Sequence, residues 1–293
     1  MNALIIGLFL PVFSLSAATV RVEGEFTGSE MPAEFLESQY DSIYRLILPG
    51  KNPDTATITA IFYSEKRRGD NFRLPEWGGG GCLGKDTIVV RVDPNPFLNQ
   101  DFFRISVHEL VHCILERAYP GIAIPRWMHE GLAMMLSGEV SVDEHLVVSK
   151  AIVTHSLLPL DAIDSVNLFP RVRADLAYAQ SHLALAFLVK TYSMGSLVEI
   201  LQATRSNGNI WAGIDTVIGL SQKEFETLYR SYLTERYRLV FLVADTYLFW
   251  LALALFAIVG ILLSVLRRRT KLARMMREEK EEEEEEEEKE KQE

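Results

Sequence analysis

The stretch His108-Glu109-Leu110-Val111-His112 carries the most structural information in this chain of 293 residues. It lies in a segment, residues 99–117, whose apolar residues recur every three or four positions and so predict a helix. The apolar stripe consists of Phe103, Val107, Leu110, Val111 and Ile114. Because His108 and His112 are four residues apart, their side chains point the same way on that helix.

Two histidines that face the same way can bind one metal ion. Glu109 is rotated about 100° round the helix from His108, so it can contact a water at the metal without being a ligand. The pattern His-Glu-x-x-His on a helix is the signature of zinc hydrolases, with the glutamate as general base. The alternative is a pair of ordinary helix histidines, which the helical context disfavours. We therefore predict a zinc site with Glu109 as its catalytic base.

A third ligand is expected from residues 126–136, an apolar stretch after Pro125 that predicts a second helix. A catalytic zinc has three protein ligands and one open position for water. Glu130 lies near the start of this helix, and the small residues Gly131 and Ala133 should let the helix approach the first one closely. Most glutamates are surface residues, but this one is flanked by apolar side chains.

His129 competes with Glu130 for the role of third ligand. Its side chain would point elsewhere when Glu130 faces the metal, so it is assigned to packing or to the rim of the site. The sequence thus predicts one Zn2+ per chain, held by His108, His112 and Glu130.

With the segment Trp127-Met128-His129-Glu130-Gly131-Leu132-Ala133, this motif resembles the gluzincin metallopeptidases, the thermolysin-like clan, and in particular their peptidase MA-like branch. The Gly-rich run 78–90 is similar to the turn and edge strand before the active-site helix of that family, and 177–192 is similar to a downstream helix. The resemblance covers residues 55–235. It implies an α+β, thermolysin-like fold, with an N-terminal sheet-plus-helix lobe, a C-terminal helical lobe and the substrate cleft between them.

The resemblance also bears on two further positions. Related aminopeptidases stabilise the oxyanion with a tyrosine at the place of Tyr178, for which the alternative is a core tyrosine on an amphipathic helix. Thermolysin-type enzymes have an aspartate four residues after the third ligand, bonded to a ligand histidine, but this chain has Met134 there. The partner of the histidine must come from elsewhere, either a backbone carbonyl or Glu139.

Secondary-structure signals along the chain favour the α+β class. Residues 20–25 alternate like a strand, and 55–63 and 87–92 are rich in β-branched and aromatic residues. Residues 33–48 have the spacing of a helix, and most of the chain after Asn99 does too. Strands first and helices later fit a sheet-plus-helix part followed by a helical part.

The N-terminal residues 1–18 have the composition of a signal peptide. Asn2 to Leu15 is apolar and uncharged, and small residues follow, so cleavage after Ala17 or Ala18 would fit export. An uncleaved anchor or a buried strand is the alternative, because no Lys or Arg precedes the apolar run.

Residues 246–266 predict one transmembrane helix, since about 20 uncharged residues are enough to span a bilayer. Three arginines, Arg267 to Arg269, follow at once and place the C-terminal side in the cytoplasm. The alternative, a buried core helix, fits this charged flank poorly. Residues 19–245 then form an extracytoplasmic peptidase domain that this helix anchors to the cell membrane. Residues 267–293 form a cytoplasmic tail that is first basic and then acidic.

The net charge of −10 argues against a nucleic-acid partner, since no basic face or stacking motif is present. The two cysteines, Cys82 and Cys113, lack zinc-finger spacing. Outside the cytoplasm they could form a disulfide or remain two separate buried thiols.

These features predict a membrane-anchored zinc metallopeptidase acting on peptide or protein substrates. Strand 86–92, which we expect at the edge of the sheet, would pair with an extended substrate chain. Two alternatives keep the zinc: a scaffold or interaction module without turnover, disfavoured by the intact Glu109, and a hydrolase of non-peptide bonds. No protein partner is indicated.

Overall fold

A small mixed sheet lies in the first part of the chain. The computed structural model describes residues 18–24, 30–63, 79–92, 100–139, 143–240 and 246–290. Its strands, in the spatial order β1-β2-β4-β3, are β1 (Thr19–Gly24), β2 (Thr57–Tyr63), β4 (Thr87–Arg91) and β3 (Gly80–Leu83). The first three are parallel, whereas β3 runs antiparallel to β4.

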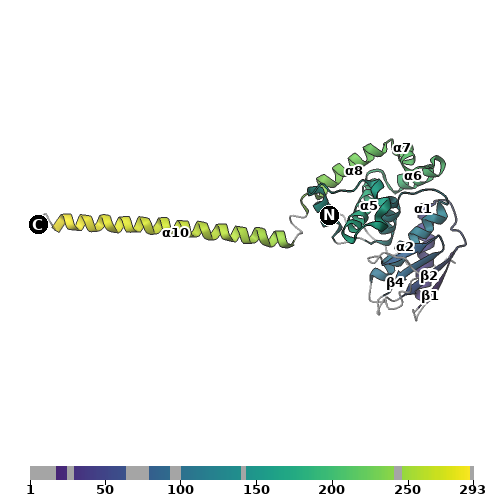
Figure 1. Ribbon diagram of the computed structural model, residues 1–293, viewed down its shortest axis with the longest axis horizontal. Helices are drawn as coiled ribbons and strands as arrows, with labels where there is room; N and C mark the ends of the chain where they lie inside the picture. Colours follow the sequence, from purple (N-terminus) through teal and green to yellow (C-terminus); the bar gives the residue numbers. More distant parts are fainter. Residues whose placement is uncertain are drawn as a thin grey trace. The chain divides into compact units, whose positions relative to one another are not determined.

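One face of this sheet is covered by two helices, α1 (Glu30–Ile47) and α2 (Gln100–Ala118) (Figure 1). Helix α1 contacts β1 and α2, and α2 contacts β3 and β4. In β2 the alternate residues Ile58, Ala60 and Phe62 are fully buried, which is the pattern of a strand with one covered face. The buried residues of the strands and of the two helices therefore form one core, and the His-Glu-x-x-His motif lies on α2, the helix that contacts the edge strand β3.

The edge strand differs from the predicted one. Residues 86–92 were expected at the edge, but β4 pairs with β2 on one side and with β3 on the other. The short glycine-rich strand β3 takes the edge position, joined to β4 by a turn in which Gly84 has φ 67°. A positive φ suits glycine because it has no Cβ to clash with the backbone. The prediction was wrong because a four-residue strand with two glycines has no strong β signal.

The second part of the unit is helical, as predicted. Its elements are α3 (Arg126–Ser137), α4 (Glu144–Val153), the 3-10 helix η3 (Leu160–Leu168), α5 (Arg171–Tyr192), α6 (Met194–Asn207), α7 (Ile210–Ile218) and α8 (Gln222–Tyr237). Helix α3 packs against α2 on one side and α5 on the other. It therefore connects the sheet part with the helical part.

An aromatic cluster holds α3 in place. Trp127, which is fully buried, stacks on Trp211 of α7 with ring centroids 5.9 Å apart and lies 5.9 Å from the ring of Phe225 on α8. Phe187 of α5 contacts the same Phe225 ring. Trp127 therefore anchors the start of α3 against α7 and α8, and Phe187 of α5 packs on the same cluster through Phe225.

The C-terminal end of α2 is held by an ionic cluster. Arg117 donates from Nε to Oδ2 of Asp54 over 2.9 Å, and it also forms an ion pair with Asp86. Tyr40 of α1 donates its hydroxyl to Asp54. The cluster ties α2 to the segment before β2 and to the β3–β4 turn.

The architecture confirms a mixed α/β fold that is mostly helical with a small sheet. The predicted strands and helices in the described residues have counterparts within a few residues of the predicted ends. The described residues up to Arg238 form one compact unit, so the division into two lobes with a cleft between them stays a prediction. The proposed signal peptide falls on residues 1–17, outside the described residues, and on Ala18, which is buried beside β1.

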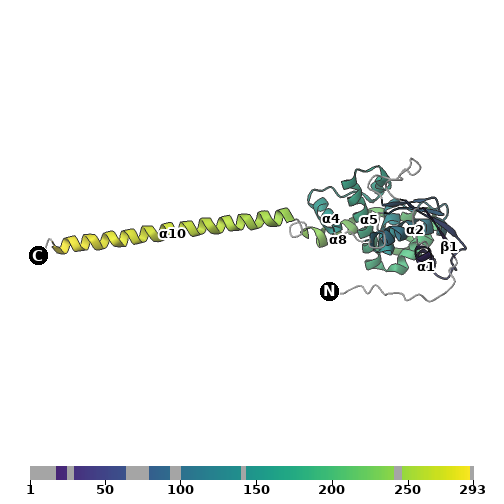
Figure 2. The ribbon, with the colours of Figure 1, turned by 90° about the horizontal axis from the view of Figure 1, so that it is seen from below.

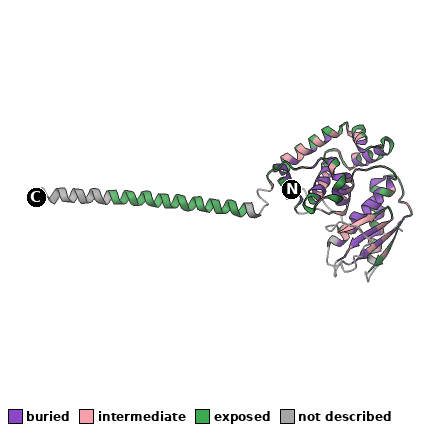
Figure 3. Ribbon diagram, in the orientation of Figure 1, coloured by how far each residue is buried: buried purple, intermediate pink, exposed green. Residues whose placement is uncertain are grey.

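A second unit consists of the uninterrupted helix α10 (Thr246–Glu290), drawn along its length in Figure 2. Its stretch Phe249–Arg277 is long and apolar enough to cross a membrane, and none of that window is buried (Figure 3). Helices α5 and α6 pass the same test when counted together, but they bend by 109° and bury many residues in the first unit. Length, apolar composition and exposure therefore make α10 the candidate membrane-spanning helix among the described helices.

Candidate metal centre

Helix α2 presents both histidines of the motif on one side. His108 and His112 are each 7 % exposed, and their rings lie 5.0 Å apart at nearly a right angle. The helix packs its apolar stripe on the sheet, including the fully buried Leu110, Val111 and Ile114. The imidazoles are therefore directed away from the sheet, toward the helical part of the unit.

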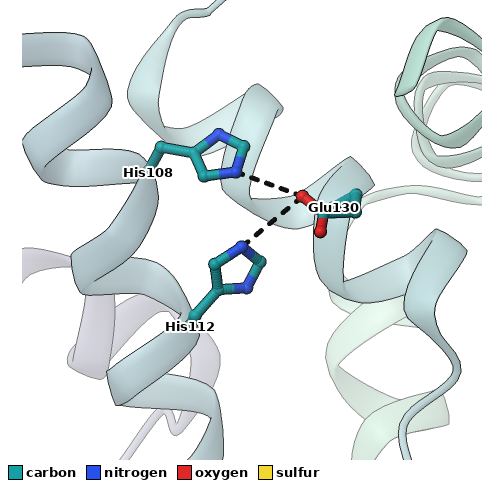
Figure 4. A group of neighbouring side chains, drawn as sticks. All are labelled: His108, His112 and Glu130. Carbon is teal, nitrogen blue, oxygen red and sulfur yellow. Dashed lines mark hydrogen bonds and ion pairs between the residues drawn. The ribbon is translucent and has the colours of Figure 1, made fainter. Parts of the chain in front are cut away.

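Glu130 of α3 reaches these imidazoles from the opposite side (Figure 4). Its Oε2 lies 3.1 Å from Nε2 of His108 and 3.5 Å from Nε2 of His112. One donor atom from each of the three residues lies within 4.8 Å of the others. The three predicted ligands are thus brought together by two neighbouring helices.

The geometry of this cluster fits a divalent metal ion. Donors about 2.0–2.2 Å from one tetrahedral ion are about 3.3 Å from each other. The observed separations of 3.1 and 3.5 Å lie on either side of this value. Glu130 is fully buried, and its Oε2 is directed at the two imidazoles. Two imidazoles and one carboxylate are also a donor set that catalytic zinc sites use.

Arg126 binds the other oxygen of the same carboxylate. Its Nε lies 2.7 Å from Oε1 of Glu130. This distance makes an ion pair, but the two groups are not aligned for a hydrogen bond. Burial alone would raise the pKa of Glu130, but His112, His108 and Arg126 hold it well below its ordinary value. Glu130 is therefore ionised, with one oxygen facing Arg126 and the other facing the histidines.

Glu139 supplies a partner for the first histidine. Its Oε2 lies 2.7 Å from Nδ1 of His108, on the far side of the ring from Glu130, which is ion-pair distance without the alignment of a hydrogen bond. Gly138, at φ 69°, ends α3, and the amide of Glu139 donates to the carbonyl of Met134. This turn at the helix end brings the chain back toward α2. The sequence left two candidate partners for the histidine, a backbone carbonyl and Glu139. In the structure the close contact of His108 is with the Glu139 carboxylate.

Glu109 lies beside the cluster and against the edge strand. It is 8 % exposed, and burial raises the pKa of its carboxyl. A Cβ on Gly80 of β3 would lie 2.9 Å from Cγ of Glu109 and 3.0 Å from Oε1. The absence of a side chain at position 80 therefore leaves room for the Glu109 carboxylate.

Tyr178 of α5 is close enough to interact with the charges of the site. Burial, followed by the negative charge of Glu130, raises the pKa of Tyr178 well above its ordinary value. The positive charge of Arg126 acts on Tyr178 in the opposite direction and lowers its pKa, but it does not outweigh burial and Glu130. Tyr178 therefore stays protonated, and its hydroxyl is available as a donor at this side of the cluster.

His129 lies outside the group of three. Its Nδ1 is 3.3 Å from Nδ1 of His112, the ring nitrogen that does not face Glu130. Burial, together with the nearby His112, lowers the pKa of His129 to about 3. His129 is therefore a neutral neighbour of His112 in this arrangement.

Three contacts of α3 were not predicted. Gly131 does not serve the approach to α2: a Cβ there would lie 2.6 Å from the carbonyl oxygen of Ser181, so this glycine permits close packing on α5. Arg126 was overlooked, although it stands four residues before Glu130, the spacing of a helical ion pair. Asp164 was overlooked as well, and it accepts a hydrogen bond from the backbone amide of Arg126 at 2.8 Å.

Comparison with known proteins agrees with this site. A family model described as the peptidase MA superfamily matches residues 56–235, which include α2, α3 and α5. The curated proteins compared with the chain give no match.

Proposed function

The chain belongs to the peptidase MA superfamily, and on this basis we propose that it is a membrane-anchored, zinc-dependent metallopeptidase. The observation that carries the proposal is the convergence of Glu130 on His108 and His112, with Glu109 beside them. A cluster that only bound a metal would have no use for a buried carboxylate next to the ligands. The combination of three ligands and a base is what metal-assisted hydrolysis of a peptide bond requires.

In this proposal His108, His112 and Glu130 hold one zinc ion per chain. Bound zinc supplies Lewis acidity toward a water molecule and the substrate carbonyl. Glu109 accepts a proton from the attacking water and then donates it to the leaving amine. The burial that raises the pKa of Glu109 suits this exchange, because a base works best with a pKa near the working pH.

Tyr178 has the role of a hydrogen-bond donor. As the peptide carbonyl becomes tetrahedral, negative charge develops on its oxygen, and a donor fixed in advance stabilises that charge. The raised pKa keeps the Tyr178 proton in place. Arg126 forms an ion pair with Glu130 and lies close enough to Tyr178 to act on it electrostatically, so its charge is shared between these two side chains.

The substrate binds as an extended strand on β3. In the described residues β3 pairs only with β4, so its other edge has no strand beside it. Gly80 of this strand contacts Glu109, which puts a peptide on that edge next to the base. Pairing through the backbone selects flexible or unfolded chains rather than a folded surface.

The membrane anchor is α10. Its apolar stretch is followed by Arg267, Arg268 and Arg269, and positively charged flanks stay on the cytoplasmic side. The unit ending at Arg238 then lies on the extracytoplasmic side and α10 continues into a cytoplasmic tail. The N-terminal segment 1–18 would serve as the export signal.

The proposal is tested by digesting a peptide library with the purified full-length protein in detergent. We expect cleavage that a chelator abolishes and zinc restores. Glu109→Gln should retain zinc and lose activity by about 10²–10⁴-fold, the usual contribution of a general base. Glu199→Gln, an exposed position on α6, is the matched control and should cleave like the wild type.

Two other results would contradict the peptidase assignment. If the wild type binds zinc and cleaves no peptide, the protein is a scaffold. If it cleaves esters or glycopeptides and leaves peptides intact, it is a hydrolase of another bond.

A further inference from the structure

Cys82 of β3 and Cys113 of α2 lie close together beside the metal centre. Their sulfur atoms are 2.6 Å apart, and both are free thiols in this structure. A disulfide bond is about 2.05 Å long, so only a small shift separates the two thiols from bonding distance. Cys113 is the residue after His112 and is fully buried, whereas Cys82 is partly exposed.

The spacing of residues along β3 matches the spacing of the residues that they contact along α2. Cys82 stands two residues after Gly80 on β3, and Cys113 stands four residues after Glu109 on α2. Two residues of a strand advance about 6.6 Å and four residues of a helix about 6 Å, so the two spacings agree. Gly80 lies against Glu109, and Cys82 lies against Cys113. The strand thus runs along the helix in one register, with the thiols next to the base.

We propose that Cys82 and Cys113 form a disulfide that fixes the edge strand to the helix bearing His108, Glu109 and His112. It would hold the backbone of Gly80 against the Glu109 carboxylate. An extracytoplasmic position, part of the function proposed above, provides the oxidising surroundings in which such bonds persist.

The bond forms by thiol–disulfide exchange with a small-molecule or protein disulfide. The thiolate of Cys82, the more exposed of the pair, attacks one sulfur of that disulfide and displaces its other half as a thiol. The thiolate of Cys113 then attacks the Cys82 sulfur and releases the second half. Two thiol protons are lost, the pair is oxidised by two electrons, and the external disulfide is reduced to two thiols.

The test is the intact mass of the full-length protein, purified without reductant, incubated with oxidised glutathione, denatured and treated with N-ethylmaleimide. We expect no adduct, and two adducts when a phosphine reductant precedes the treatment. Two adducts without reductant would overturn the proposal, as would a stable glutathione adduct or a disulfide between two chains.

Thermal unfolding gives a second readout. Phosphine reduction should lower the apparent melting temperature of the wild type by roughly 5–10 °C, because the bond closes a loop of about 30 residues. The Cys82→Ala variant should show no such effect of reductant. An equal effect of reductant on both proteins would overturn the proposal. Neither measurement depends on peptidase activity, so a failure here is distinct from a failure of the proposed function.

Discussion

His108 is held between two carboxylates, with Nε2 at 3.1 Å from Glu130 and Nδ1 at 2.7 Å from Glu139. Histidines that bind metals usually donate their second ring N–H to such a group, which fixes the tautomer and the ring orientation. Glu139 occupies this role in space although it lies nine residues beyond Glu130 in the sequence. In the proposed metal site, Glu139 would take the place of an acidic residue at position 134, where this chain has Met134.

Replacement of Glu139 should weaken the metal site. We expect Glu139→Ala to reduce zinc affinity by about 10–100-fold, the usual effect of losing such a partner. Glu139→Gln should lose less, because its amide oxygen can accept a hydrogen bond from the N–H of the imidazole. Competition with a chromophoric zinc chelator measures the change, and Glu199→Ala is the control. Equal affinity of Glu139→Ala and the wild type would show that the contact does not support the metal.

Removal of the Tyr178 hydroxyl should affect turnover rather than binding. Tyr178→Phe is expected to lower kcat by about 10²–10³-fold, as for the loss of one donor to an oxyanion. The KM and the zinc content should change little, because the ring remains in place. Tyr192→Phe, on the same helix, is the control. A large rise in KM at unchanged kcat would instead assign Tyr178 to substrate binding.

A methyl group at position 80 should disturb the base. In Gly80→Ala the new Cβ would lie 2.9 Å from both Cγ of Glu109 and the carbonyl oxygen of Val89, so one of them must move. We expect activity to fall at least about tenfold at unchanged zinc content, since small misplacements of catalytic groups are costly. Gly195→Ala on α6, where the nearest atom is 3.5 Å away, should be neutral. Full activity of Gly80→Ala would show that β3 does not constrain Glu109.

The ionic cluster at the end of α2 should make stability depend on acid. Burial alone would raise the pKa of Asp54, but Arg117 and Tyr40 outweigh it and lower that pKa. A lowered carboxyl pKa stabilises the fold above the unfolded value of about 3.9 and stops doing so as the pH falls through the folded value. The Asp54 side chain is 36 % exposed, so the effect should be about 1 kcal/mol or less.

Urea unfolding of Asp54→Asn and the wild type checks this dependence. The variant should be less stable at pH 7, and the difference should shrink between about pH 5 and about pH 3. A difference that is constant over this range would mean that the charge of Asp54 does not contribute.

The sequence predicted well the parts of the site that depend on local periodicity. The four-residue spacing placed both histidines on one face of α2, and apolar neighbours marked Glu130 as a residue turned inward. Both indications follow from the geometry of a single helix. The catalytic and ligand roles of these residues stay predictions.

Contacts between elements could not be predicted in the same way. Gly131 was expected to serve the contact with α2, yet it permits the contact with α5, because sequence does not tell which neighbour a small residue faces. The edge position of β3 depends on pairing across a turn, which four residues with two glycines do not reveal. Glu139 reaches His108 only through the reversal at Gly138, so its choice over a backbone carbonyl needed coordinates.

The central claim is that His108, His112 and Glu130 together bind one metal ion. Metal analysis of the purified full-length protein, after equilibration with zinc and removal of the unbound ion, tests it most directly. We predict about one zinc per wild-type chain and a large loss in Glu130→Ala, with Glu109→Gln unchanged. A wild type without stoichiometric metal, or a Glu130→Ala variant that keeps all of it, would contradict the claim.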